Sequence, residues 1–149
     1  MTREDLVALC ERPARLVAQL GTANPAALEA ELAKLDVDQL VAATLMAAAE
    51  GWLTPKEAGG VRFGRLAKAC DELGGNSLDA VDMDGPAAGP HTHPRGEVEL
   101  CIPVSGQPRF DGRDSRWVVY PPGSRHVPTV TGGRMLILYF LPGGEITWG

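Results

Sequence analysis

The chain has 149 residues and a formal net charge of −5, because 19 acidic residues outnumber 14 lysines and arginines. With 44% hydrophobic and 22% charged residues, it is not a disordered or fibrous protein, since those classes lack the apolar side chains that build a core. The acidic balance argues against a nucleic-acid-binding protein, which needs a basic surface, and no apolar stretch is long enough to span a membrane.

The first part of the chain predicts helices. Apolar residues recur at helical spacing from Leu6 to Leu20, and Pro13 predicts a break between two helical pieces. The three cysteines are odd in number, far apart in the chain and form no Cys-x-x-Cys motif. Because the first twenty residues also carry several charges rather than a secretory apolar core, we expect reduced thiols in a cytoplasmic protein.

Two further helices are predicted before residue 59. Asn24 and Pro25 are an N-cap residue followed by a proline at the first helical position. Asp38 is expected to cap the next helix, which would end near Gly51. The faces that these two helices are expected to bury consist of Leu28, Leu32 and Leu35 in the first and Leu40, Val41, Leu45 and Ala48 in the second. Helices this short need a packing partner.

From about Val61 the pattern changes to short β-type runs separated by Gly, Pro and Asp. Strands are expected at 61–66, 77–83, 97–104, 116–120, 126–130, 134–141 and 145–148. Turns are expected at Gly74-Gly75-Asn76, Ser105-Gly106, Asp111-Gly112 and Gly132-Gly133. Many short strands with tight turns are typical of a sandwich or small barrel. The predicted fold class is therefore α+β, with a helical segment over 1–58 and a small antiparallel β-barrel over 59–149.

All three histidines lie in two short segments of the β-rich part. His91 and His93 share one face of a strand because side chains alternate along it. Glu97 and Glu99 share a face for the same reason, and His126 follows a Pro-x-Gly turn. A single histidine is usually a structural residue, but three imidazoles beside a carboxylate suit a divalent metal with open coordination positions. Two inward carboxylates without a cation would also be costly to bury.

These two segments resemble the two motifs of the cupin superfamily, whose fold is a double-stranded β-helix barrel. The second motif, Pro-x-Gly-x-x-His, is matched without change by Pro121, Gly123 and His126. The resemblance therefore implies that His126 is a metal ligand and that the β-rich part closes into a barrel around it.

The first cupin motif is matched with slightly altered spacing. It begins with His-x-His, which His91 and His93 match. Counting forward from His93 to the motif's glutamate selects Glu97, whereas counting back six residues from Gly106 selects Glu99. We take Glu97 as the metal ligand and assign Glu99 a role in proton transfer or in supporting the ligands.

The resemblance extends to one smaller family. The runs that carry it include Trp-Leu-Thr-Pro at 52–55, His-Thr-His-Pro-Arg-Gly-Glu at 91–97 and Tyr-Phe-Leu-Pro-Gly-Gly at 139–144. Together they look like the 4-hydroxylaminobenzoate lyases, and the similarity covers most of residues 50–149. Membership would imply conversion of 4-hydroxylaminobenzoate to 3,4-dihydroxybenzoate (protocatechuate) with release of ammonia.

That reaction assigns roles to particular residues. A metal on the three histidines and Glu97 could act as a Lewis acid on the departing hydroxyl group or supply hydroxide. Glu99 could move a proton, and Tyr139 could contact the flat ring and donate a hydrogen bond. Fe, Mn, Zn, Ni and Co all suit such a ligand set, so the sequence leaves the metal open.

A benzoate substrate also needs a cation that binds its carboxylate, and the fork of arginine suits this better than lysine. Arg62 and Arg109 are the preferred candidates. Arg125 is a third, although in a regular strand it would face away from its neighbour His126.

Two other functions fit the same motifs. One is a cupin dioxygenase that uses Fe(II) and O₂ on a small aromatic compound, and oxygen consumption would identify it. The other is a non-catalytic cupin that binds a small ligand without turnover. In each case we expect the helices to cover an edge of the barrel or to build a homodimer, with no nucleic acid or membrane as partner.

Overall fold

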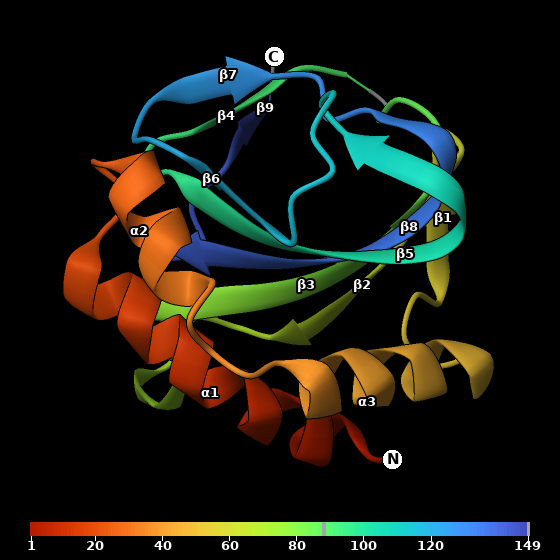
Figure 1. Ribbon diagram of the computed structural model, residues 1–149, viewed down its shortest axis with the longest axis horizontal. Coiled ribbons are helices and arrows are strands. Elements are labelled where there is room, and N and C mark those ends of the chain that lie inside the picture. The colour runs from red at the N-terminus through yellow and green to blue at the C-terminus, as the bar shows by residue number, and fades with distance from the viewer. Residues whose placement is uncertain (88, 149) are drawn as a thin grey trace.

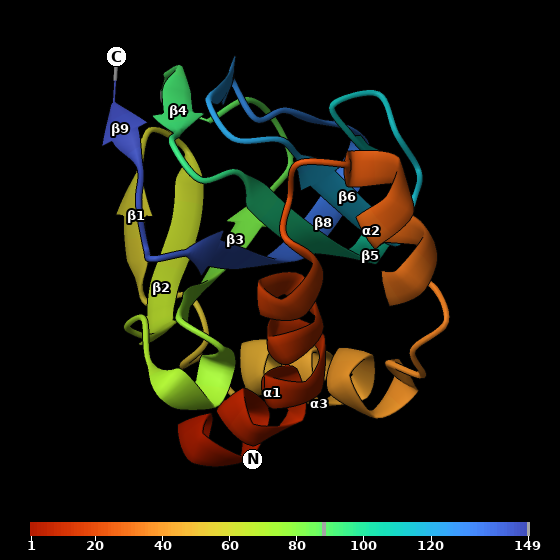
Figure 2. The same cartoon turned by 90° about the vertical axis from the view of Figure 1, so that its left-hand side faces the viewer.

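The computed structural model, which describes residues 1–87 and 89–148, has the predicted α+β class. Helices cover one face of a six-stranded antiparallel sheet, and a three-stranded sheet lies on the other side (Figures 1 and 2). The strand order is β1-β2-β3-β8-β5-β6 in the large sheet and β7-β4-β9 in the small one. Facing antiparallel sheets fit the cupin architecture expected from the sequence, but the described strands form two separate sheets rather than the single closed barrel that was predicted.

The helices and strands have the following bounds in chain order. The helices are α1 (Arg3–Leu20), α2 (Pro25–Leu32) and α3 (Asp38–Ala49), with a short 3₁₀ helix, η1 (Asp71–Leu73), after the second strand. The strands are β1 (Lys56–Ala58), β2 (Val61–Ala67), β3 (Asn76–Met83), β4 (His91–His93), β5 (Glu97–Phe110), β6 (Trp117–Tyr120), β7 (Ser124–His126), β8 (Val130–Pro142) and β9 (Thr147–Trp148).

Helix α1 continues through Pro13, so the predicted break is wrong. The helix begins with a capping box in which Thr2 and Asp5 exchange side-chain and backbone hydrogen bonds. Pro13 is itself buried, and α1 buries side chains on both sides of it against the sheet. This packing holds the helix together although proline lacks the N–H for one intrahelical hydrogen bond.

Helices α2 and α3 form where predicted but differ in detail. The Asn24 side chain accepts a hydrogen bond from the Ala27 N–H, which confirms the N-cap of α2. Asp38 is not a cap, because its own N–H donates to the Asp36 side chain and α3 begins at Asp38. The buried face of α3 consists of Leu40, Ala43, Thr44 and Ala47. Of the predicted face only Leu40 is fully buried, and Leu45 is 38% exposed, because small residues let α3 lie close to α1.

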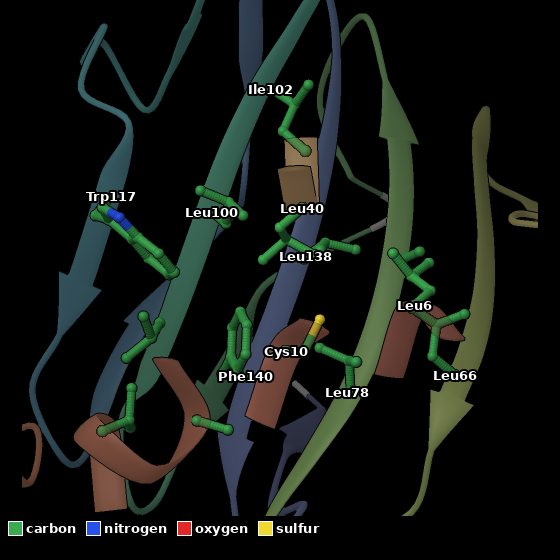
Figure 3. Close-up of a cluster of buried hydrophobic side chains, with 14 of the residues drawn as sticks. Leu6, Cys10, Leu40, Leu66, Leu78, Leu100, Ile102, Trp117, Leu138 and Phe140 are labelled. Carbon is green, nitrogen blue, oxygen red and sulfur yellow. The ribbon is translucent and has the colours of Figure 1, made fainter. Parts of the chain in front are cut away.

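Side chains alternate between two apolar layers across the large sheet. Those facing the helices include Leu78, Leu100, Ile102, Leu138 and Phe140 (Figure 3). Val98 and Leu136 belong to the same cluster. Those facing the small sheet include Met83, Cys101, Met135, Ile137 and Tyr139. Because both faces are buried, β8 is a nearly continuous apolar run rather than an alternating one.

Strands β5 and β8 run straight through two of the predicted turns, Ser105-Gly106 and Gly132-Gly133. Gly106 pairs with Gly133 across these strands, beside register shifts in the ladder. A Cβ on Gly106 would lie 2.5 Å from the Gly132 carbonyl oxygen, and Gly106 has a φ of +69°. The glycines therefore permit a bulge at which the two backbones approach closely, and the chain turns at Asp111-Gly112, as predicted.

The strand predicted at 126–130 is absent. Strand β7 ends at His126 and β8 begins at Val130. Pro128 lacks an N–H for a sheet ladder, and the Thr129 N–H donates to the side chain of Asp111. Strand β1 was not predicted. It pairs with β2 and lies just before residue 59, where the β-rich part was expected to begin.

Helix α2 covers the edge of the large sheet, as expected. Glu29 accepts two hydrogen bonds from the Arg113 guanidinium, at 2.8 and 3.0 Å. Its carboxylate also accepts from the backbone N–H of Val119 in the edge strand β6, at 2.9 Å. The edge is thereby capped, since this N–H is occupied. Within the described residues, no helix combines the length and apolar character needed to cross a membrane.

Candidate metal centre

The structure brings together the four residues predicted as metal ligands. His91, His93, Glu97 and His126 each offer a ligand atom, and these atoms lie within 4.8 Å of one another. Strands β4 and β7 pair antiparallel with His91 opposite His126, so that all three imidazoles lie at one end of the small sheet. The i, i+2 spacing of His91 and His93 and the Pro-x-Gly turn before His126 therefore bring the three imidazoles together.

Glu97 reaches the histidines because the turn between β4 and β5 is very tight. Gly96 has a φ of +84°, and its N–H donates to the carbonyl of His93. A Cβ at Gly96 would lie 2.6 Å from the Tyr120 carbonyl oxygen, so a glycine is required by both conformation and space. Strand β5 can then begin at Glu97 directly behind His93.

The burial of these polar groups fits a bound cation. His91, His93 and Glu97 are 5%, 1% and 0% exposed. The ring nitrogens of His91 and His93, both Glu97 oxygens and Nε2 of His126 are buried without a hydrogen-bond partner. The Glu97 oxygens lie against Nε2 of His93 and of His126, but not in hydrogen-bond geometry. Buried polar atoms that face one point without such bonds are costly unless a cation binds there.

The two glutamates of β5 have opposite electrostatics. Burial alone would raise the pKa of Glu97, but contacts with His126 and His93 outweigh it and the pKa is about 2. Glu99 lies on the same face without those partners, and burial followed by the charge of Glu97 holds its pKa well above the usual range. These opposite shifts favour the ionised form of Glu97, which is the form that binds a metal, and the protonated form of Glu99.

The histidines also differ. Burial, followed by the neighbouring His93, lowers the pKa of His91 to about 4, which favours the neutral form that binds metals. Burial would lower the pKa of His126 as well, but Asp111 and Glu97 raise it to about 9. His126 is thus held between two carboxylates.

Asp111 is a site residue that the sequence analysis did not find. His126 Nδ1 lies 2.8 Å from its Oδ2, and the Tyr120 hydroxyl donates to the same oxygen at 2.5 Å. The Thr129 N–H donates to Oδ1 at 2.8 Å. Although burial opposes it, these bonds lower the pKa of Asp111, so the carboxylate can only accept. Nδ1 of His126 must then keep a proton, so that Nε2 is the ring nitrogen that can exchange its proton for a metal.

Asp111→Asn is expected to weaken metal binding by about 10–100-fold, the usual effect of removing such a supporting partner. Asparagine tolerates the positive φ of +50° at this position, so the turn is preserved. An amide nitrogen in place of Oδ2 cannot accept from His126 or Tyr120. Metal titration of the apoprotein measures the affinity, and exposed Asp114→Asn in the same loop is the control. Equal affinities for the Asp111→Asn variant and the wild type would exclude this supporting role.

A cavity of about 580 Å³ opens beside His91 and His93. Its walls are mostly apolar and include Val81, Tyr139 and Trp148. The Trp148 ring meets the His91 ring edge-on, with centroids 5.1 Å apart. Flat apolar walls beside a metal-ligand cluster suit a small aromatic molecule.

Other predicted site residues are placed in different ways. Tyr139 lines the cavity, and its partner across the sheet is Glu99, which is fully buried beside the cluster. Arg62, Arg109 and Arg125 are exposed, and the structure brings none of them to the cavity lining. Arg62 is next to Phe63, which lines the cavity from β2. The Arg62 side chain donates a hydrogen bond to the Thr54 carbonyl oxygen.

Comparison with known proteins finds a family model and relatives that are similar to this chain. A family model described as "PnbB: 4-hydroxylaminobenzoate lyase" matches residues 26–148. The chain is 35% identical over 108 residues to the 4-hydroxylaminobenzoate lyase of Nocardioides sp. (strain LMS-CY), covering 66% of this chain and 64% of that protein. It is 31% identical over 117 residues to that of Pseudomonas putida, covering 67% and 66%. The match thus spans slightly less than two thirds of either relative.

Among solved structures, similar chains include an oxalate oxidase in complex with the substrate analogue glycolate. It shares 18% identity, with 62% of this chain and 57% of that chain covered and a TM-score of 0.43. A cupin-like protein from Thermotoga maritima shares 17% identity, with 62% and 77% covered and a TM-score of 0.42.

Proposed function

The chain belongs to the 4-hydroxylaminobenzoate lyase family, and we propose on that basis that it converts 4-hydroxylaminobenzoate to protocatechuate and ammonia at the cluster of His91, His93, Glu97 and His126. The observation that carries the proposal is that two residues of this cluster, His91 and His93, line an apolar cavity. An aromatic ring fits such walls, and its polar substituent then faces the ligand atoms.

The reaction needs no external oxidant. The N–O bond breaks, its electron pair leaves with the hydroxyl group as water, and a water oxygen adds to the ring carbon next to the nitrogen. A second water replaces the nitrogen, which leaves as ammonia. One water is consumed overall, so that the nitrogen is reduced and the ring is oxidised within one molecule.

The chain's own residues position and protonate the reacting groups. A divalent metal, when bound, supplies Lewis acidity to the departing hydroxyl group. Glu99 is fully buried beside the cluster with no hydrogen-bond partner for either oxygen, and we assign to it the transfer of a proton to or from the substrate. Tyr139, its cross-strand partner, forms part of the wall against which the ring would lie.

The donor set suits several metals. Three imidazoles and one carboxylate bind Fe(II), Mn(II), Zn(II), Ni(II) or Co(II), whose order of affinity is set by the metal more than by this site. Elemental analysis of the purified protein identifies the ion.

Homodimer formation and a cytoplasmic location stay predictions. The three cysteines are free, as expected.

The test is anaerobic incubation of the metal-loaded protein with 4-hydroxylaminobenzoate. Equal amounts of protocatechuate and ammonia, measured by chromatography, are expected without O₂, and metal-depleted protein is the control. Product that forms only with O₂ would identify a dioxygenase instead. No product from metal-replete protein under either atmosphere would overturn the proposed activity.

A further inference from the structure

The lining of the cavity includes charged residues that no role has yet explained. Lys56, Arg65 and Asp79 are the charged residues among those that line it, apart from the histidines. Their formal charges sum to +1. A cavity that is otherwise apolar, and that is lined both by two of the metal-ligand histidines and by a net positive charge, suits an aromatic ligand that carries one anionic group.

The guanidinium of Arg65 is already oriented. Its Nε donates to Asp79 Oδ1 at 2.9 Å, and its Nη2 donates to Oδ2 at 3.2 Å. Asp79 thus holds one edge of the fork. The second edge, made by Nη1 and the other hydrogen of Nη2, has no partner among the described residues. Two parallel N–H groups are the geometry that binds a carboxylate in bidentate fashion.

Strand register places Arg65 in line with Glu99, to which we assigned proton transfer. Arg65 pairs with Asp79, Asp79 with Tyr139, and Tyr139 with Glu99 across strands β2, β3, β8 and β5. Residues paired in this way share one face of the sheet. Three strand spacings separate Arg65 from Glu99, which is roughly 14 Å between backbones, and both side chains extend over the same face.

We propose that Arg65, oriented by Asp79 and assisted by Lys56, binds the carboxylate of a para-substituted benzoate. This inference rests on the proposed function for the reaction but adds how the substrate is oriented. A para-substituted ring carries its two groups at opposite ends, so that the carboxylate meets Arg65 while the nitrogen faces the metal cluster. An ortho-substituted benzoate cannot reach both ends.

The test uses a ligand that does not react. Calorimetric binding of 4-aminobenzoate to metal-loaded wild type is compared with binding to Arg65→Met, which keeps an unbranched apolar side chain. We expect affinity to fall about tenfold to a hundredfold, as for loss of a charge-assisted hydrogen bond. Binding of the neutral 4-aminobenzamide should change less than about threefold. Arg62→Met, from the opposite face of the same strand, is the matched control and should bind like wild type.

One alternative is that the unpaired Asp79 merely repels the ligand in Arg65→Met. The double variant Arg65→Met/Asp79→Asn removes that charge, and it should remain as weak as the single variant. Recovery of binding in the double variant, normal binding in Arg65→Met, or no binding of 4-aminobenzoate to wild type would each overturn the inference. Turnover is not needed for these measurements. Arg65-dependent binding without any lyase product would instead overturn the proposed function alone.

Discussion

Alanine at His91, His93 or His126 is expected to strip the metal from the protein and to abolish turnover. Each residue supplies one of four ligand atoms gathered within 4.8 Å. Removal of a mere supporting partner already weakens metal sites about 10–100-fold, and loss of a ligand atom should exceed that. Elemental analysis after dialysis measures the metal, and product formation from 4-hydroxylaminobenzoate measures the activity.

The variants should still fold. The three histidines lie on the small sheet, whereas the apolar layers are built on the six-stranded sheet, so the melting transition and circular dichroism should remain those of a folded protein. Thr92→Ala is the matched control, because Thr92 lies between two ligands on the same short strand. It should retain metal and activity. Full metal occupancy in the three histidine variants would show that the ion binds elsewhere.

Local patterns sufficed for much of this centre. The i, i+2 spacing of His91 and His93 requires only that the segment be extended, and Pro-x-Gly before His126 requires only a turn. Asn24 likewise predicts the start of a helix, and this prediction does not depend on what the helix packs against. Such features depend on a few neighbouring residues, and the structure has each of them.

The carboxylate-binding end could not be found in the same way. Arg65 reaches the line of Glu99 only because β3 and β8 lie between their strands, an order that joins residues distant in sequence. The alternation of apolar and polar residues does not reveal which face of β2 is turned to the cavity, because both faces carry apolar residues. Phe63 faces the cavity and Leu66 faces the helices, so the pattern cannot favour Arg65 over Arg62. The role of Asp111 beside His126 could not be predicted from the sequence, because Asp-Gly is also an ordinary turn sequence.

Glu97 and Glu99 lie two residues apart on β5. Replacing each of them by glutamine, which is a conservative change, can separate their roles. Both side chains point to the same face and both are fully buried, so replacement by glutamine removes one buried carboxyl group in each case without changing the size of the side chain. They differ in position, because the Glu97 oxygens lie among the ligand atoms and those of Glu99 do not. Metal binding and proton transfer should therefore separate.

Glu99→Gln is expected to keep its metal and to lose about 10²–10⁴-fold in kcat, the usual contribution of a positioned acid or base. Glutamine fills the same space but cannot move a proton. Glu97→Gln should instead lose metal, and its activity should return in part when metal is supplied in excess. Elemental analysis and steady-state kinetics on both variants distinguish the two roles. If Glu99→Gln loses the metal and Glu97→Gln retains it, Glu99 is the ligand, and the count from Gly106 rather than from His93 was correct.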